Sequence, residues 1–95
     1  MYELQTTSNF RKRYKKLAEK KKKLQNSIQK TLALLRLNPK YKSLKTHKVF
    51  LSQYGEVYSS FVTSDIRIIW IQIENKLIVL LLDIGGHSGG KSVYK

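Results

Sequence analysis

The spacing of apolar residues changes along this chain of 95 residues, and each change predicts a different element. Residues 2–7 alternate in side-chain character, which predicts a short strand that joins a sheet. Phe10, Tyr14 and Leu17 then recur every three or four positions, which predicts a helix with one buried face and a cap between residues 7 and 9. A second stripe of this kind predicts a helix from about residue 25, or slightly earlier, to residue 37; its members are Leu24, Ile28, Leu32 and Leu35.

The second half of the chain has the two-residue spacing of strands. Pro39 ends the second helix because proline cannot continue the hydrogen-bond ladder. Residues 39–53 are expected to form a basic connector anchored by Tyr41, Leu44 and Phe50. Three strands are then predicted, with tight turns at 64–65 and 74–76, which gives an antiparallel meander; the strands cover residues 57–63, 66–73 and 77–84.

These elements predict a single α+β domain over residues 1–95. Their order is β-α-α-β-β-β, and the helical hairpin is expected to pack on one face of a small antiparallel sheet. Residues 93 and 94 can add an optional last edge strand. In the strand at 66–73, Ile66 and Ile68 point to one face while Arg67 and Ile69 point to the other, so both faces are expected to be at least partly covered.

Composition narrows the class of protein further. Apolar residues make up 41% of the chain and charged residues 26%, as in ordinary globular domains. The absence of cysteine excludes a disulfide framework, a thiolate zinc site and a cysteine nucleophile. The first residues do not have the pattern of a signal peptide, and the longest apolar run covers only residues 77–82, too few to span a bilayer. We therefore expect a cytoplasmic protein with no membrane partner.

The charge of the chain is concentrated in its first half. The formal net charge is +13; residues 1–48 contain fifteen basic and two acidic side chains, and residues 49–95 contain four of each. A charge concentrated in one half of the chain attracts polyanions. We therefore expect nucleic acid as the leading class of partner and anionic lipid as the second. Arg13 and its basic neighbours are expected to face outward from the first helix; the neighbours that we expect to bind RNA are Arg11, Lys12, Lys15 and Lys16.

One motif in the C-terminal segment is misleading. Residues 85–92 match the phosphate-binding pattern of Gly, four residues, Gly, Lys and Ser, and they follow a predicted strand. Such a loop binds phosphate at the N-terminus of the helix that it opens, and only residues 93–95 follow here. We therefore do not expect this segment to bind a nucleoside triphosphate.

The chain has two histidines, His47 and His87, and both are expected to be accessible. His47 lies between Lys45 and Lys48, and His87 shares a glycine-rich loop with Lys91. RNA can be cleaved without a metal when its own 2′-hydroxyl attacks the adjacent phosphorus, which requires a base, an acid and cations for the phosphorane oxygens. The chain contains this set, whereas two isolated histidines and scattered carboxylates make a poor metal site, so neither a metal nor a cofactor is expected.

Three further residues each have two interpretations. Asp65 is either a simple turn residue or part of an active site. Arg67 interrupts an apolar strand, so it either pairs with a carboxylate such as Asp65, Asp83 or Glu56, or opens onto a cleft that binds phosphate; we favour the cleft. Tyr94 is either a strand-end anchor or a proton carrier or stacking platform near the C-terminal loop.

Four segments occur in an order and spacing that are fairly specific: a basic helix at 10–17, a histidine-bearing basic segment at 38–48, a strand pair spanning 58–70, and a Gly-Gly-His segment at 83–87. Together these segments resemble the RelE/ParE superfamily of type II toxin-antitoxin toxins. The two histidine-bearing segments are similar to those of its YafQ/RelE-like mRNA interferase branch. The resemblance implies two helices on an antiparallel sheet, and a toxin that enters the ribosomal A site and cuts mRNA until a cognate antitoxin binds it.

The resemblance also implies roles for individual residues. It implies that His87 is the general acid, that His47 and Asp65 lie in the active cleft, and that Arg67 contacts the scissile phosphate. It further implies that Lys45 and Lys48 contact RNA. In the family an aromatic residue commonly follows the histidine within a few positions, whereas residues 88–93 separate His87 from Tyr94 here, so either Tyr94 or Lys91 completes the site.

Two other functions stay open at this stage. The ParE branch of the superfamily poisons DNA gyrase by binding it, and the same helices would then contact a protein. A degenerate toxin that binds antitoxin but has lost its chemistry is the third alternative. Either way an acidic antitoxin segment is expected to pair with the basic surface.

Overall fold

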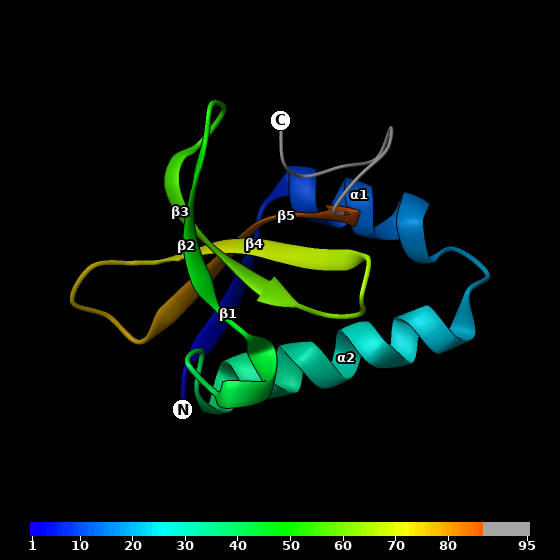
Figure 1. Cartoon of the computed structure of the whole chain (residues 1–95), viewed down its shortest axis with the longest axis horizontal. Coiled ribbons are helices and arrows are strands. Elements are labelled where there is room, and N and C mark those ends of the chain that lie inside the picture. Colours follow the sequence, from blue (N-terminus) through cyan, green and yellow to red (C-terminus); the bar gives the residue numbers. More distant parts are fainter. Residues whose placement is uncertain (87–95) are drawn as a thin grey trace.

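The structure is a computed structural model, and it describes residues 1–86. The elements in chain order are β1 (Glu3–Thr6), α1 (Ser8–Ala18), α2 (Lys22–Leu37), the short 3-10 helix η1 (Lys42–Leu44), β2 (His47–Leu51), β3 (Gly55–Phe61), β4 (Ile66–Gln72) and β5 (Ile78–Gly86). Figure 1 shows these elements as two helices packed along one sheet. The predicted α+β class and the helical hairpin are confirmed. His87, Lys91, Tyr94 and the optional last strand lie outside the described residues.

The sheet is mixed rather than purely antiparallel. Its strand order is β1-β5-β4-β3-β2, and the pairs among β2–β5 are antiparallel, as predicted. β1, however, lies at one edge and runs parallel to β5, with Glu3 opposite Ile78 and Thr6 opposite Leu81. An alternating pattern predicts a strand but not its direction, so the sequence could not specify this pairing.

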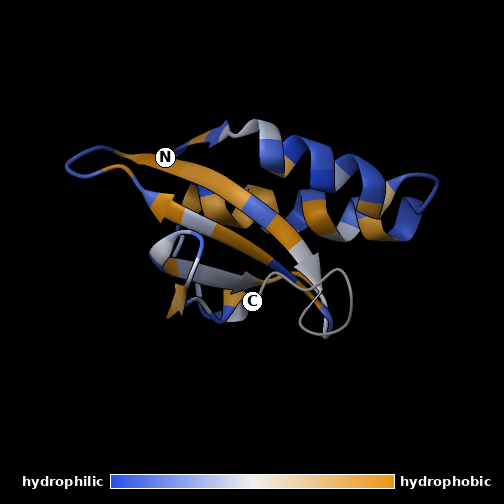
Figure 2. Ribbon diagram, turned by 90° about the horizontal axis from the view of Figure 1, so that it is seen from above, coloured by the Kyte–Doolittle hydropathy of each residue, from blue (hydrophilic) through white to orange (hydrophobic). Residues whose placement is uncertain are grey.

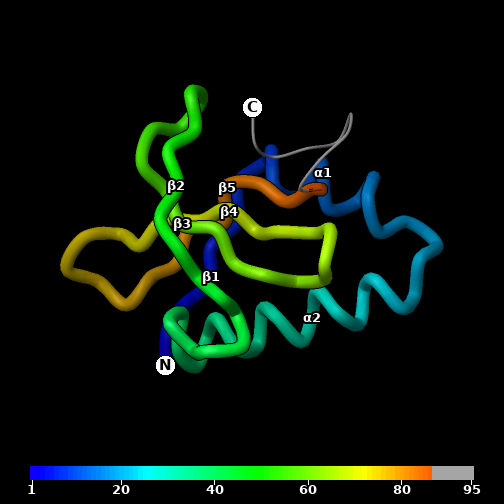
Figure 3. Tube along the Cα trace, in the orientation of Figure 1, coloured from blue at the N-terminus to red at the C-terminus, as the bar shows by residue number. Residues whose placement is uncertain are grey.

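The two helices form the crossover that begins at β1. The side chain of Thr7 caps α1 by accepting a hydrogen bond of 3.1 Å from the backbone N–H of Phe10. Phe10 and Leu17 are buried, which confirms the predicted stripe. The chain then reverses through Lys20, whose φ is +58°, and returns along α2, as the tube in Figure 3 shows. Among the helices in the described part of the chain, none has both the length and the apolar character needed to cross a membrane.

The segment at 39–53 differs most from its prediction. It contains η1 and the edge strand β2, which pairs with β3, instead of an irregular connector. Leu44 is buried, as predicted, but Tyr41 and Phe50 are 50% and 78% exposed and are not anchors. Only alternate residues of an edge strand face an apolar layer, and the exposed ring of Phe50 obscures that alternation in the sequence.

Apolar residues cover both faces of the sheet, as predicted. The main core lies between the helices and the sheet and includes Phe10, Ile28 and Trp70. A smaller cluster of Leu51, Val57 and Ile69 covers the other face, which we call the outer face. Figure 2 shows hydrophobic residues concentrated on the central strands and hydrophilic residues along the exposed side of α1.

Candidate functional site

Two cations lie on one aromatic ring at the outer face. Strand register places Arg67 directly opposite Phe61 on one side and Gly85 on the other. The Arg67 guanidinium lies 4.9 Å from the centre of the Phe61 ring, and the Lys45 ammonium lies 5.1 Å from it. We call Lys45, Phe61 and Arg67 the cation row. Because Gly85 has no side chain, no side chain of β5 covers Arg67 at this pair.

His47 lies beside the cation row on the same face. It pairs with Ser59, and Ser59 pairs with Ile69 of the outer cluster, so side-chain alternation places the imidazole on the outer face. Strand spacings put the Cα atoms of His47 and Arg67 about 12 Å apart. At this separation the two side chains can both contact one phosphodiester.

The ring orientation of His47 is set by a backbone contact. Its Nδ1 lies 3.1 Å from the carbonyl oxygen of Lys45, and His47 itself is exposed. A carbonyl only accepts hydrogen bonds, so Nδ1 is the donor and the neutral ring leaves Nε2 as an acceptor. This tautomer presents a basic nitrogen to solvent at the outer face.

A buried relay holds the backbone between Lys45 and His47. The indole N–H of Trp70 donates to the Ser60 hydroxyl at 2.8 Å, and Ser60 lies 2.6 Å from the Thr46 hydroxyl. Thr46 in turn donates to the carbonyl of Pro39 at 2.8 Å, so the hydroxyl of Ser60 must donate to Thr46. With Thr46 fixed toward the main core, its two neighbours project to the outer face.

Lys45 also has an unusual backbone conformation. Its φ of +48° lies in the left-handed region, at the C-terminus of η1. A side chain other than glycine or asparagine costs on the order of 1 kcal/mol there. This conformation places the lysine side chain over the Phe61 ring. Backbone strain thus occurs at a candidate functional residue, as is common at functional sites.

Arg67 does not pair with any of the carboxylates considered for it. In the part of the chain that the structure describes, its guanidinium donates to the backbone carbonyls of Thr63 and Ile66. Glu56 pairs with Lys48, Asp83 pairs with Arg13, and Asp65 is exposed in the β3–β4 turn. The predicted pairing of Arg67 with one of these carboxylates is therefore not found among the described residues, and the phosphate-binding cleft stays a prediction.

The remaining predicted cations lie elsewhere. Lys48 pairs with Tyr58 of the main-core side, so it projects from β2 away from His47 rather than beside it. On α1, Lys12 and Lys16 lie three residues after Asn9 and Arg13 and therefore border the same side of the helix. Arg11 turns instead to Thr6, to whose hydroxyl it donates at 2.7 Å, and Lys15 follows it one turn later.

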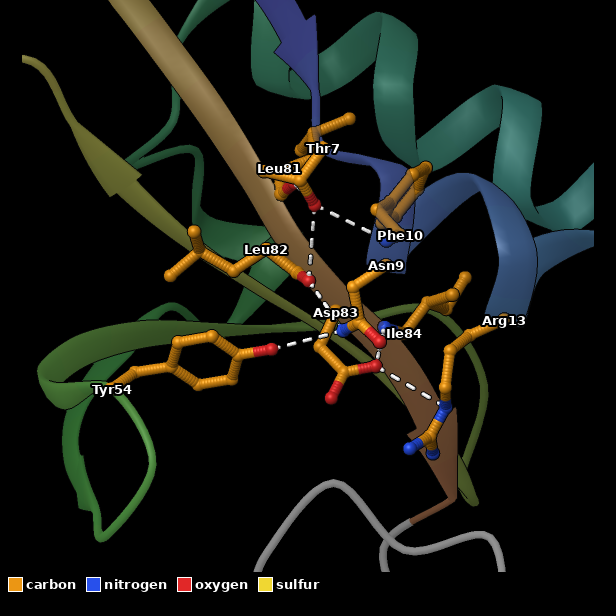
Figure 4. Close-up of polar contacts among 9 residues, drawn as sticks. All are labelled: Thr7, Asn9, Phe10, Arg13, Tyr54, Leu81, Leu82, Asp83 and Ile84. Atoms are coloured by element: carbon orange, nitrogen blue, oxygen red, sulfur yellow. Dashed lines mark hydrogen bonds and ion pairs between the residues drawn. The ribbon is translucent and has the colours of Figure 1, made fainter.

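A second polar group fastens α1 to β5, and Figure 4 shows how its side chains meet. A β-bulge inserts Leu82 between the pairs Trp70–Leu81 and Ile69–Asp83. Asn9 donates to the Leu82 carbonyl and to the hydroxyl of Tyr54, both at 2.9 Å. The Arg13 guanidinium lies 3.3 Å from the carboxylate of Asp83, which is a buried residue. We call Asn9, Arg13, Tyr54 and Asp83 the Asp83 cluster.

The Asp83 cluster changes the acidity of its tyrosine. Burial raises the pKa of Tyr54 above its usual value of 10.0, the carboxylate of Asp83 raises it further, and Arg13 and the hydrogen bond from Asn9 oppose the change. The expectation that Arg13 faces outward is wrong, because it pairs with a buried acid. Asp83 lies two residues before Gly85, which pairs with Arg67 of the cation row, so the cluster holds this part of β5 against α1.

Several of these residues carry no clear signal in the sequence. Phe61 and Tyr54 resembled ordinary strand and turn aromatics, and Ser60 and Thr46 gave no signal that they would share a hydrogen bond. A strand aromatic opposite an arginine was the one available sign of the cation row. No group of three or more His, Asp or Glu side chains that could hold a metal lies within residues 1–86.

Known proteins resemble this chain in structure rather than in sequence. No protein-family model matches the chain, and no curated protein is significantly similar to it. YafQ from E. coli strain BL21(DE3) superposes with a TM-score of 0.69 at 23% identity, covering 90% of this chain and 93% of that one. A chain of the E. coli DinJ-YafQ complex gives 0.65 at 24%, covering 92% and 94%. A chain of the intact E. coli RelBE toxin-antitoxin complex gives 0.60 at 18%, covering 94% and 100%.

These likenesses extend over nearly the whole of both chains. At 18–24% identity they establish the fold, and they do not by themselves transfer a reaction or a set of residues. The predicted arrangement of a helical hairpin on a small sheet is therefore also the fold of these solved structures.

Proposed function

We propose that this chain, which has the fold of YafQ and of RelE-like toxins, is the toxin of a toxin-antitoxin pair and cuts mRNA on the ribosome. The observation that carries the proposal is that Lys45, His47 and Arg67 lie on the outer face, where Arg67 pairs with Gly85 near the end of β5. His87 is the next residue of the chain. A base and two cations are thus supplied by two separate segments that share one side of the sheet, and in the proposal the acid is His87.

The proposed reaction uses the 2′-hydroxyl of the RNA as nucleophile. The free Nε2 of His47 accepts its proton while the 2′-oxygen bonds to phosphorus. The bond from phosphorus to the 5′-oxygen breaks, and His87 protonates that oxygen, with either Tyr94 or Lys91 completing the site. The products are a 2′,3′-cyclic phosphate and a 5′-hydroxyl. Arg67 and Lys45 stabilise the phosphorane charge, and Asp65 is kept as the alternative base.

The partners follow from the same surface. The cations of α1 are proposed to hold ribosomal RNA, and the protein would act in the cytoplasm, where ribosomes are found. A cognate antitoxin with an acidic segment would bind the basic surface and block the site. The DinJ-YafQ and RelBE complexes support such a partner, because both contain a protein of this fold together with another protein.

Induced expression followed by primer extension tests the proposal. The wild-type chain should arrest growth and create new 5′ ends in translated messages. Arg67→Ala and His87→Ala should lower cleavage by about 100-fold or more, because each removes a charge or proton donor used in the transition state. Lys76→Ala, in the exposed β4–β5 turn, is the matched control and should cut normally. Intact messages together with DNA damage would instead assign the chain to gyrase poisoning.

A further inference from the structure

The β2–β3 hairpin has a second surface on the side opposite to His47. Lys48 lies opposite Tyr58, and Phe50 lies opposite Glu56. Tyr58 stacks on Trp70 of the main core, with ring centres 4.7 Å apart, so these paired side chains project from the main-core side of the sheet. We call the group the hairpin strip: Lys40, Lys48, Phe50, Glu56 and Tyr58.

Phe50 is the feature of the strip that the fold does not explain. It is 78% exposed, the highest value among the exposed large apolar side chains of the described chain. The ring contributes almost nothing to burial there, and an exposed aromatic on an edge strand favours unwanted association. In Figure 1 the hairpin extends away from α2. A single exposed ring is common, so its neighbours decide what it can bind.

Strand register places Lys48, Glu56 and Tyr58 on the same side of the hairpin as Phe50, and Lys40 lies on the Tyr58 ring. The Lys40 ammonium lies 4.8 Å from the centre of the Tyr58 ring. The Lys48 ammonium lies 3.3 Å from the Glu56 carboxylate, and these side chains are 61% and 68% exposed. An ion pair that is this exposed is weak. The pair keeps Lys48 beside Phe50, and the Lys48 ammonium stays accessible to another ligand.

This arrangement matches the chemistry of an unpaired nucleotide. An aromatic face stacks on a base of any sequence, and nearby ammonium groups bind the adjacent phosphates. An apolar protein partner would instead favour a contiguous apolar patch, whereas here the exposed ring lies next to the ion pair of Lys48 and Glu56. The net charge of +13 favours a polyanion over an apolar surface.

We propose that the hairpin strip binds single-stranded RNA, with a base stacked on Phe50 and phosphates held by Lys40 and Lys48. This inference rests on the proposed function in taking RNA as the ligand. The strip and His47 lie on opposite sides of the sheet, so the bound segment is not the phosphodiester that is cut. The strip would hold a second segment of the RNA while the outer face acts.

Fluorescence anisotropy with a labelled single-stranded RNA tests this binding. The RNA is fully 2′-O-methylated, so it cannot be cut by its own 2′-hydroxyl and binding is scored apart from cleavage. Phe50→Ala and Phe50→Leu should each weaken binding about 5- to 100-fold, because neither offers a π face, and Phe50→Trp should retain it. The matched control is Leu77→Ala, which removes another exposed apolar side chain, at 58% exposure, and should bind like the wild type.

The other outcomes each overturn one claim. Normal binding by Phe50→Ala, full retention by Phe50→Leu, or no binding by the wild type would overturn the role of the strip. Loss of antitoxin binding by Phe50→Ala with RNA binding intact would assign the strip to a protein partner instead. Failure of the wild type to cut all-ribose mRNA would overturn the proposed function alone, provided that the methylated RNA still binds through Phe50.

Discussion

The ion pair of the Asp83 cluster should respond unequally to the loss of either partner. The Asp83 side chain is 6% exposed, and the Arg13 side chain is 31% exposed. Replacing Arg13 by Met keeps much of its apolar stem but removes the cation from a buried carboxylate, which costs about 3 kcal/mol of unfolding free energy. Replacing Asp83 by Asn keeps an oxygen that accepts from the Ile84 N–H, a bond of 2.8 Å, and lets Arg13 reach water, which costs about 1 kcal/mol.

Urea denaturation at neutral pH, followed by the fluorescence of the single tryptophan, measures both values. For a domain of this size a loss of about 3 kcal/mol lowers Tm by roughly 12 °C or more, so thermal melts give an independent check. The double variant Arg13→Met/Asp83→Asn completes a mutant cycle. It should be more stable than Arg13→Met alone, because the buried charge has gone. Equal costs for the two single variants, or a double variant whose cost is their sum, would refute this reasoning.

Three further predictions concern the groups around the site. Lys45→Gly should raise the unfolding free energy by up to about 1 kcal/mol, because glycine adopts the left-handed backbone without strain. The same variant should cut RNA more slowly, because it lacks the cation. A variant that neither gains stability nor loses activity would contradict this prediction. Ser60→Ala should cost about 1–3 kcal/mol in urea denaturation, since the buried N–H of Trp70 loses its acceptor, and a neutral substitution would contradict the relay. Tyr54 should ionise above pH 10 in an ultraviolet phenolate titration, and at a higher pH than in the Asp83→Asn variant. Because its pKa is raised in the folded state, the contribution of Tyr54 to stability is fully present below pH 10 and is lost as the pH rises through the folded pKa.

Much of the fold could be predicted because its signals are periodic. The helical stripes of α1 and α2 and the alternation in β4 are visible in the sequence, and the structure confirms them to within a few residues. β2 could not be predicted because it is an edge strand with an exposed Phe50. The parallel pairing of β1 with β5 depends on where the whole crossover returns, which no local pattern records.

The candidate site could be predicted in its charges but not in its supports. Lys45, His47 and Arg67 were recognisable as cations or histidines near apolar segments. Strand register brings His47 and Arg67 to one face, and Lys45 reaches that face through its contact with Phe61. Their positioning depends on pairs distant in sequence, such as Thr46 with Ser60. Arg13 lies in a run of similar basic residues, so nothing in that run indicated that it alone would meet Asp83.

The central claim is that the 2′-hydroxyl of the message is the nucleophile at the outer face. It is tested most directly by mapping the ends of an mRNA that is bound to ribosomes and exposed to the purified chain, with and without one 2′-deoxynucleotide at the cut position. We expect the all-ribose message to be cut to a 2′,3′-cyclic phosphate and a 5′-hydroxyl, and the single 2′-deoxy substitution to abolish that cut. Cleavage that persists at the deoxy position, or an all-ribose message that stays intact, would contradict it.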